Sequence, residues 1–443
     1  MNEKRQASRA HDRQIFALAV PALGALVAEP IFLATDTVMV GHLGADALGG
    51  LAIASSLLQT MIGLMIFLAY ATTPLVARRW GAGDLNGAIS SGVASLVMAA
   101  ALGIILLGLG FLFGDTLIAL MNPTPEVAEA AAQYLFISML GIPAMLMVLA
   151  MTGLLRGLQD TKTPLYISLA GFGLNIVLNY LLIYIFNFGI SGSAAGLAIV
   201  QWLMFFTFAW VLWRRILREN LTPKLDLAGL IVNLKLGFWL FLRTITLRLG
   251  LMAAVAIGTT MGTETLATYQ IIFTLYSVTS FALDALAISA QAMVGKALGA
   301  SDAAGAQAVI RRTIFWGILS GAIIGLIIIC LSPFIARIFS DDPAILNMAP
   351  WPLIVLGISM PLGGFVFVLD GVLMGAADVR YLAFVGLINL AVYLPVLWVI
   401  LALQLSGTIG LVALTAAFCI VFMASRAVTL GLRIRGSKWM VLG

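Results

Sequence analysis

Six charged side chains stand well inside long apolar runs of the sequence, where a charge is expensive. They are Glu29, Asp36, Arg243, Arg248, Asp284 and Asp370. On membrane-insertion scales, a charge near the centre of an apolar helix costs about 2.5–3.5 kcal/mol. Each of the six is therefore a candidate for an ion pair or for a role in moving ions.

Asp36 is the strongest candidate for ion chemistry. It lies in the run ATDTVMVGHLG, which contains no lysine or arginine. A carboxylate in apolar surroundings binds a proton more readily than one in water, and it can hold either a proton or a cationic ligand. Competition between the two is the minimum requirement for antiport. We interpret Asp36 as the coupling residue, and the alternative is an aspartate at a helix end that reaches the membrane interface.

Three further polar residues are expected near Asp36 or in line with it. Glu29 precedes Asp36 by two helical turns, which places it on nearly the same stripe, about 10 Å deeper. A two-step proton path is one reading of Glu29, and a pair with a neighbouring helix is the other. Asn175 and Asn179 are spaced i, i+4 and so share one helix face. They can orient a proton, a water or a ligand at Asp36, or simply hydrogen-bond between helices.

In the second half of the chain, Arg243 and Asp284 come out at similar depth when counted from the ends of their helices. They are predicted to form a structural ion pair. Asp370, beside Gly371, is predicted to be a gate or capping residue.

The sequence contains no nucleophile–base constellation, no phosphate-binding glycine loop and no His/Cys metal spacing. The chain is therefore predicted not to be an enzyme and to need no metal or cofactor beyond a coupling ion.

Composition identifies the medium in which these residues must be positioned. The chain of 443 residues is 62% hydrophobic and only 10% charged, with a mean hydropathy of +1.09. Soluble domains are about half apolar and about a quarter charged. About twelve continuous apolar runs are each long enough to cross a bilayer as a helix. Because backbone groups in lipid must be satisfied internally, the predicted fold class is an all-α polytopic membrane protein. The predicted spans are 15–40, 46–74, 88–113, 127–155, 163–186, 190–213, 228–258, 264–294, 313–336, 344–374, 380–403 and 407–432.

Basic residues gather in alternate loops of this twelve-span arrangement. The opposite loops hold one basic residue, Arg337, among acidic side chains. Under the positive-inside rule this asymmetry places both termini in the cytoplasm. The expected location is a bacterial-type cytoplasmic (inner) membrane.

The two halves of the sequence repeat at an offset of 218 residues. VARRWGAGD at 76–84 recurs as VGKALGASD at 294–302, and GLLRGLQD at 153–160 recurs as GVLMGAAD at 371–378. Pro125 is likewise repeated at Pro343. Six spans per half predict a parallel repeat with two pseudo-symmetric lobes. The predicted domains are a six-helix lobe at 14–213, a cytoplasmic linker at 214–227 and a second six-helix lobe at 228–436.

The motif DTVMVGHLG at 36–44, with RRWGAGD, GKALGASD and GLLRGLQDT, resembles the multidrug and toxic compound extrusion (MATE) family. AEPIFLATDTVMVGHLG and FVLDGVLMGAAD are most similar to its DinF branch. The resemblance implies two six-helix lobes forming a V around a central cavity, and efflux driven by entry of protons or sodium. It also implies that Asp36 is the coupling acid and that the first helix bends at Pro21.

The sequence departs from other members of this family at several site positions. The Asn…Asp pair of the archaeal members on the fifth span corresponds to Asn175 and Asn179, and their threonine on the sixth span falls at Leu197. The sodium-linked members also use an acid on the seventh span, where this chain has Arg243 and Arg248. The resemblance therefore favours proton coupling through Asp36 over sodium coupling. The expected function is export of organic cations or amphipathic drugs by a monomer that contacts membrane lipid and no nucleic acid. The alternative is a flippase for a lipid-linked intermediate.

Overall fold

The computed structural model describes residues 2–225 and 227–442, and every regular element in these ranges is helical. Eleven stretches among them are long and apolar enough to cross a membrane. A twelfth consists of α5 (Pro125–Met139) and α6 (Ile142–Gly157), which are bent by 50° at their junction. Pro143, which lacks a backbone N–H, lies at this break. The predicted all-α polytopic fold with about twelve spans is confirmed.

The chain divides into two compact units. The first unit comprises Gly24–Gly237, and the second comprises Met1–Leu23 with Phe238–Gly443. Helix α1 (Asn2–Gly41) contributes to both. Besides α5 and α6, the other helices of the first unit are α2 (Ala45–Met65), α3 (Phe67–Gly81), α4 (Leu85–Ala119), α7 (Lys162–Tyr180), the π-helical turn η1 (Leu181–Ile185) and α8 (Gly189–Arg218). Its core lies between α3, α4, α6 and α8, around Ile89, Leu154 and Phe208.

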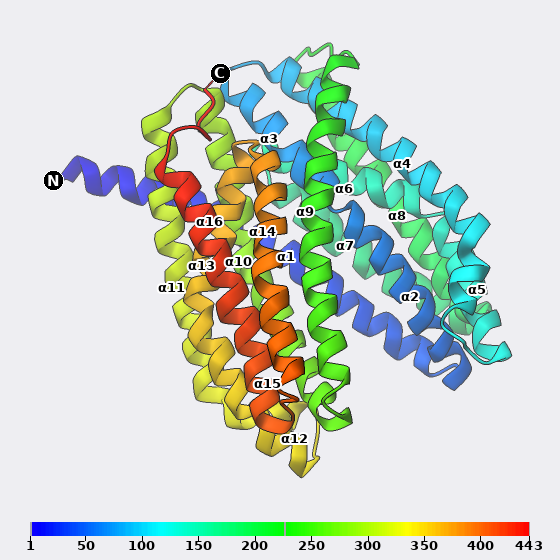
Figure 1. Ribbon diagram of the computed structural model, residues 1–443. Helices are drawn as coiled ribbons and strands as arrows, with labels where there is room; N and C mark the ends of the chain where they lie inside the picture. Colours follow the sequence, from blue (N-terminus) through cyan, green and yellow to red (C-terminus); the bar gives the residue numbers. More distant parts are fainter. Residues whose placement is uncertain (1, 226, 443) are drawn as a thin grey trace. The chain divides into compact units, whose positions relative to one another are not determined.

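The second unit is built around α13 (Pro350–Gly375), the most deeply buried span. Helix α13 lies alongside α11 (Ala303–Ile335) (Figure 1), and the two are close because glycines face backbone across the interface. A Cβ on Gly325 would stand 2.1 Å from the carbonyl oxygen of Gly357. Such contact between small residues is how membrane helices pack. The remaining helices are α9 (Leu227–Thr259), α10 (Thr263–Gly299), the 3₁₀ turn η2 (Ala336–Ile338), α12 (Pro343–Met348), α14 (Val379–Ala402), α15 (Gly407–Ala416), the π-helical turn η3 (Ala417–Phe422) and α16 (Met423–Arg435).

The boundaries of the units differ from the predicted lobes at 14–213 and 228–436. The start of α1 belongs to the second unit, where Asp12 pairs with Arg312 and Phe16 packs edge-on against Trp316, with ring centroids 4.7 Å apart. Conversely, the start of α9 belongs to the first unit, where Asn233 donates to Ser95 Oγ over 2.9 Å. A boundary drawn at loops misses these exchanges because the chain passes from one unit to the other within α1 and within α9.

The predicted linker at 214–227 is partly helical. Helix α8 continues to Arg218, and the non-helical segment that follows is fastened to α4. The backbone N–H of Thr222 donates to Asn86 Oδ1 over 3.1 Å, and that of Lys224 donates to Ser90 Oγ over 3.1 Å. The linker is thus held to the first unit up to this point. Its position 226 lies outside the described residues.

The sequence repeat is also a structural repeat. Asp84 and Asp302 both cap the following helix by accepting the N–H of a glycine three residues on, at 2.7 Å and 2.8 Å. A Cβ on Gly153 would meet the carbonyl oxygen of Ala69 at 2.6 Å. The same addition to Gly371 would meet the carbonyl of Ala287 at 2.4 Å. Left-handed residues recur at the same offset, namely Gly44 and Gly262, Gly83 and Ser301, Gln159 and Ala377, and Gly189 and Gly407.

Large apolar side chains cover much of the outer surface. Leu112 is 71% exposed, Leu326 62% and Trp398 67%. A water-soluble protein rarely exposes contiguous apolar surface on this scale. These helices therefore require lipid around them, as the composition predicts.

Candidate functional site

Asp36 is buried in the first unit, and three side chains donate hydrogen bonds to it. Asn179 Nδ2 and Ser193 Oγ both donate to Oδ1, over 2.7 Å and 2.5 Å. Tyr134 donates from its hydroxyl to Oδ2 over 3.2 Å. The donors come from α5, α7 and α8, so four helices converge on one carboxylate. Among the described residues no basic side chain forms an ion pair with Asp36.

The two asparagines predicted to lie near Asp36 behave differently. Asn179 contacts it directly, while both side-chain polar atoms of Asn175 are buried without a hydrogen-bond partner among the described residues. The Oδ1 of Asn179 is likewise without one. Gly196 of α8 makes room for this amide, because a Cβ at that position would stand 2.2 Å from Asn179 Oδ1.

Two of the three donors were not predicted from the sequence. The family resemblance placed a hydroxyl of the sixth span at Leu197 and therefore indicated its loss. The structure supplies a hydroxyl one helical turn earlier, at Ser193, which is fully buried. Tyr134 was also missed. Serine and tyrosine are ordinary in membrane helices, and only the meeting of α5 and α8 with α1 at Asp36 distinguishes these two.

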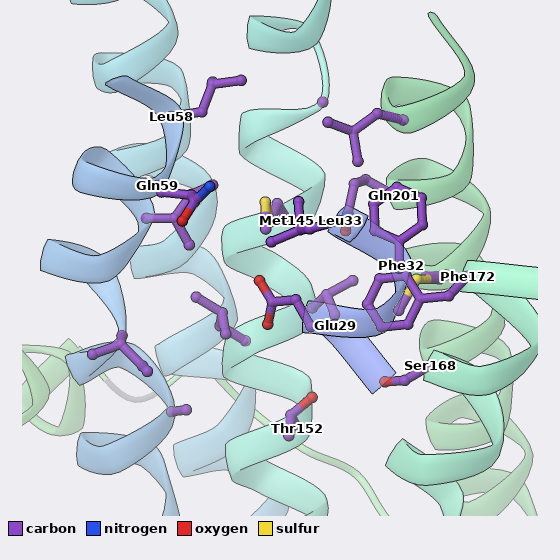
Figure 2. A pocket seen from close by; sticks show the side chains of 18 of the residues that line it. Glu29, Phe32, Leu33, Leu58, Gln59, Met145, Thr152, Ser168, Phe172 and Gln201 are labelled. Atoms are coloured by element: carbon purple, nitrogen blue, oxygen red, sulfur yellow. The ribbon is translucent and has the colours of Figure 1, made fainter. Parts of the chain in front are cut away.

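A large cavity opens beside this site, within the first unit (Figure 2). It contains about 1360 Å³ of space outside protein atoms, part of it at the open mouth. Its walls are mostly apolar, aromatic and thioether side chains, including Phe32, Phe172, Met145 and Met204. Ligand pockets are usually apolar with a few placed polar groups. Tyr134 lines this cavity while donating to Asp36, so the cavity and the acid share a side chain.

Glu29 lines the same cavity and does not contact Asp36. Figure 2 shows its carboxylate pointing into the cavity, on the opposite side from the rings of Phe32 and Phe172. It forms no hydrogen bond or ion pair with any described residue. The ion pair with a neighbouring helix, one of the two readings of the sequence, is therefore not formed within the part of the chain that the structure describes.

Pro21, where the family resemblance implies a bend, is buried in an unbroken α1. The helix also continues through Pro30. The junction of the two units falls just after Pro21, between Leu23 and Gly24. Pro21 is thus near the place where α1 passes from one unit to the other.

In the second half of the chain, Arg243 forms an ion pair with an acid that was not predicted as its partner. Arg243 of α9 binds Asp370 of α13 through both carboxylate oxygens. Arg426 of α16 also pairs with Asp370, at 3.3 Å. Asp370 is the acid that these two arginines share, and it does not cap a helix. Depth along two helices does not determine which faces meet, and this is why Asp370 was not predicted as a partner of Arg243.

A multi-helix membrane protein with a buried acid beside a large pocket has the form of a transporter. The chain matches the MatE family model over residues 21–181 and 225–399. It is 31% identical to Protein DETOXIFICATION 44, chloroplastic, of Arabidopsis thaliana, over 97% of this chain and 84% of that protein. It is 26% identical to DNA damage-inducible protein F of Escherichia coli, over 82% of this chain and 81% of that protein.

The fold agrees with these sequence relationships. The solved structure of the Vibrio cholerae MATE transporter VcmN in its bent form matches with a TM-score of 0.88, at 18% identity, over 99% of this chain and 100% of that chain. The chain belongs to the MatE family of multidrug efflux transporters. It is a multi-pass membrane transporter and not an enzyme. The predicted family is confirmed, and the Escherichia coli relative agrees with the expected similarity to the DinF branch.

Proposed function

We propose that this protein exports small amphipathic or cationic compounds by proton-coupled antiport, with Asp36 as the coupling acid. The observation that supports it most is the contact of Tyr134 with both the cavity and Asp36. Antiport requires that substrate and proton influence the same group. A side chain shared by the cavity and the acid provides the physical link.

The three donors determine where a proton would bind. Asn179 Nδ2 can only donate, and together with Ser193 it occupies Oδ1. The proton therefore goes to Oδ2, opposite Tyr134. A tyrosine hydroxyl can donate or accept. When Oδ2 carries a proton, the Tyr134 hydroxyl accepts from it and turns its own O–H away, which changes the wall of the cavity.

Sodium is the second candidate ion, because the structure holds unused oxygens near Asp36. The Oδ1 atoms of Asn175 and Asn179 have no hydrogen-bond partner among the described residues. Oxygen atoms of this kind are ligands for hard cations. The proton is favoured over sodium because three protein groups already donate hydrogen bonds to the carboxylate, and a sodium ion bound there would have to displace them. A flippase for a lipid-linked phosphate fits less well, since Arg156 is the one basic residue that lines the cavity.

The charge pattern of the loops supports a cytoplasmic location for both termini. We further propose a bacterial-type cytoplasmic membrane as the location and the monomer as the working unit.

The deciding experiment uses purified protein in proteoliposomes loaded with a cationic dye. A pH gradient and a sodium gradient are imposed separately. Efflux that follows the pH gradient and ignores sodium supports the proposal. Efflux that follows sodium alone assigns the coupling to the oxygens of Asn175 and Asn179, and efflux that follows neither refutes coupled antiport.

A further inference from the structure

Helix α1 carries two carboxylates that each accept three hydrogen bonds, one in each unit. The donors to Asp36, in the first unit, are Asn179, Ser193 and Tyr134. Asp12, in the second unit, accepts from Nε of Arg312 and Nε1 of Trp316, each over 2.8 Å, and from Nη2 of the same arginine. A bidentate guanidinium contact fixes orientation as well as position. The start of α1 is thus fastened to α11 within the second unit.

The ring of Phe16, one helical turn further along α1, strengthens this attachment. It packs edge-on against Trp316, so one side chain of α11 contacts both a ring and a carboxylate of α1. From there α1 continues as an unbroken helix to Gly41. About 36 Å of helix separates Asp12 from Asp36. Rigid helices are among the elements that carry coupling between distant sites.

The repeat places a neutral attachment on the equivalent helix, α9. The offset of 218 residues pairs α1 with α9 and α4 with α11. The start of α9 is fastened to α4 within the first unit, where Asn233 donates to Ser95 Oγ over 2.9 Å. Helix α4 has Ala94 at the position of Arg312. The two attachments therefore occupy equivalent places in the fold, and the one on α1 is ionic.

The ionic attachment and the coupling acid occur on the same helix. Helix α9 lacks both acids, and Leu230 and Ala254 occupy the positions of the two aspartates. Asp12 is paired with a guanidinium, whereas no basic residue in the described part of the chain forms an ion pair with Asp36. A helix that transmits a change needs one end that is held and another whose contacts respond to the proton. Helix α1 meets both requirements.

From this arrangement we infer that Asp12 and Arg312 are positioning residues for coupled transport, which transmit the protonation of Asp36 through α1 to the second unit. The inference rests on the proposed proton-coupled efflux and extends it. A proton at Asp36 reverses the hydrogen bond with Tyr134 and so alters how α1 is held in the first unit. A bound proton shifts a conformational equilibrium only through contacts that differ between the states. Without the ion pair, the proton still binds, but its effect does not reach the second unit.

The stability of the fold does not account for this pair. The side chains of Arg312 and Asp12 are 30% and 21% exposed, and ion pairs with such access to water add little to stability. A second pair in the same unit provides a matched control. Arg433 donates to both carboxylate oxygens of Asp378, over 2.7 Å and 3.2 Å, at comparable exposure. That pair joins α16 to the residue before α14 and leaves α1 untouched.

The first test measures efflux of ethidium, driven by a pH gradient, from proteoliposomes that hold the full-length protein. Asp12→Asn and Arg312→Gln should each slow efflux about tenfold, as loss of a charge-assisted contact can. Ethidium binding should change by less than about threefold and the melting temperature by less than about 2 °C, because the pair lies away from the cavity and is partly exposed. Asp12→Glu keeps the charge and should retain most of the efflux, and Asp378→Asn should transport like wild type.

Two outcomes of this test overturn the inference. One is efflux by Asp12→Asn at the wild-type rate. The other is an equal loss of efflux in Asp378→Asn, which would make the effect a general one of ion pairs in the second unit. If Asp12→Asn is not recovered in folded form, Arg312→Gln decides in its place, since it leaves the carboxylate and its tryptophan donor unchanged.

The second test follows the two units directly, without a transported compound. Ala82 and Ala300 are exposed residues at equivalent loop positions of the first and second units. Each is replaced by a spin-labelled cysteine after Cys330, the exposed native cysteine, is changed to serine. The distance between the labels should change between acidic and alkaline pH, and Asp12→Asn should abolish most of that change.

A control identifies the group that titrates. His11 is the neighbour of Asp12 and also takes up protons near neutral pH. Asp36→Asn should therefore remove the distance change if Asp36 is its source. A distance that does not respond to pH, or a response that persists in either Asp12→Asn or Asp36→Asn, overturns the inference.

Together the two tests separate this inference from the proposed function. If the distance responds to pH through Asp12 and Asp36 but no efflux follows the pH gradient, transmission through α1 stands and proton-driven antiport fails. If efflux follows the pH gradient equally in wild type and Asp12→Asn, antiport stands and transmission through the ion pair fails.

Discussion

The hydroxyl of Tyr134 lies 3.2 Å from Oδ2 of Asp36 and also forms part of the cavity wall. In the proposed mechanism, the same group therefore contacts the coupling acid and the space for substrate. Because Asn179 and Ser193 occupy Oδ1, the tyrosine faces the oxygen that remains for a proton. We propose that a ligand that displaces or reorients this hydroxyl changes how readily Asp36 gives up its proton. In that mechanism, proton release and substrate binding are linked through this one contact.

Substitution of Asp36 tests the coupling acid directly. Asp36→Asn keeps the size of the side chain and removes its exchangeable charge, so efflux driven by a pH gradient should fall to the level of empty liposomes. The variant should still be inserted and folded. Asp115→Asn, an exposed acid on α4, is the matched control and should transport like wild type. Gradient-driven efflux by a well-expressed Asp36→Asn protein would remove Asp36 from the mechanism.

Tyr134→Phe tests the contact between the cavity wall and Asp36 without changing Asp36 itself. It keeps the aromatic ring in the cavity wall and removes the hydroxyl that meets Asp36. Hydrogen bonds to charged groups contribute about 1.5–3 kcal/mol, so coupled efflux should fall by about tenfold or more. Dye binding should change less than about threefold, because the ring remains.

The control for this substitution is Tyr184→Phe. Tyr184 donates to the carbonyl of Met39 over 2.7 Å, so it also contacts α1, but it does not line the cavity. Its loss should leave efflux within about twofold of wild type. If both variants lose efflux equally, the effect is one of helix packing, and the link through Tyr134 is wrong.

The fold could be predicted from the sequence because lipid imposes a simple requirement. A span must be apolar for about twenty residues, and each of the twelve runs meets that requirement. The repeat was readable for a similar reason, since the Asp84 and Asp302 caps need the same residue types at the same spacing. The sequence could not predict that the start of α1 belongs to the second unit and the start of α9 to the first. This exchange depends on contacts between helices that are far apart in sequence.

The site was predicted only in part. Asp36 and Asn179 were found because a charge or an amide in an apolar span is unusual. Ser193 was missed because hydroxyl groups are common in such spans and can bond their own helix. The pairing of Arg243 with Asp370 was not predicted, since both Asp284 and Asp370 lie on later spans and the sequence does not show which acid the helix packing brings to Arg243.

The cluster around Asp370 is predicted to stabilise the second unit. Asp370→Asn leaves two buried guanidinium groups without their carboxylate, and removal of one partner from a buried pair costs about 3–5 kcal/mol. The melting temperature in detergent should therefore fall clearly below that of wild type. Asp341→Asn, an exposed acid before α12, should melt like wild type. An unchanged melting temperature for Asp370→Asn would show that the cluster contributes no net stability.

Two glycines of α4 give a matched test of the helix packing. A Cβ on Gly103 would stand 2.5 Å from the Cα of Pro143, while a Cβ on Gly108 would meet nothing within 4 Å. Backbone at Pro143 cannot yield as a flexible side chain can, so Gly103→Ala should destabilise the protein by about 1–3 kcal/mol, as overpacking does. Gly108→Ala should be neutral or slightly stabilising, because alanine favours helix more than glycine does. The repeat extends the prediction to Gly321, where an added Cβ would lie 2.3 Å from the carbonyl oxygen of Met360. Thermal unfolding of the three alanine variants should rank Gly108→Ala well above the other two, and equal melting temperatures would contradict the close approach of α4 to α6 and of α11 to α13.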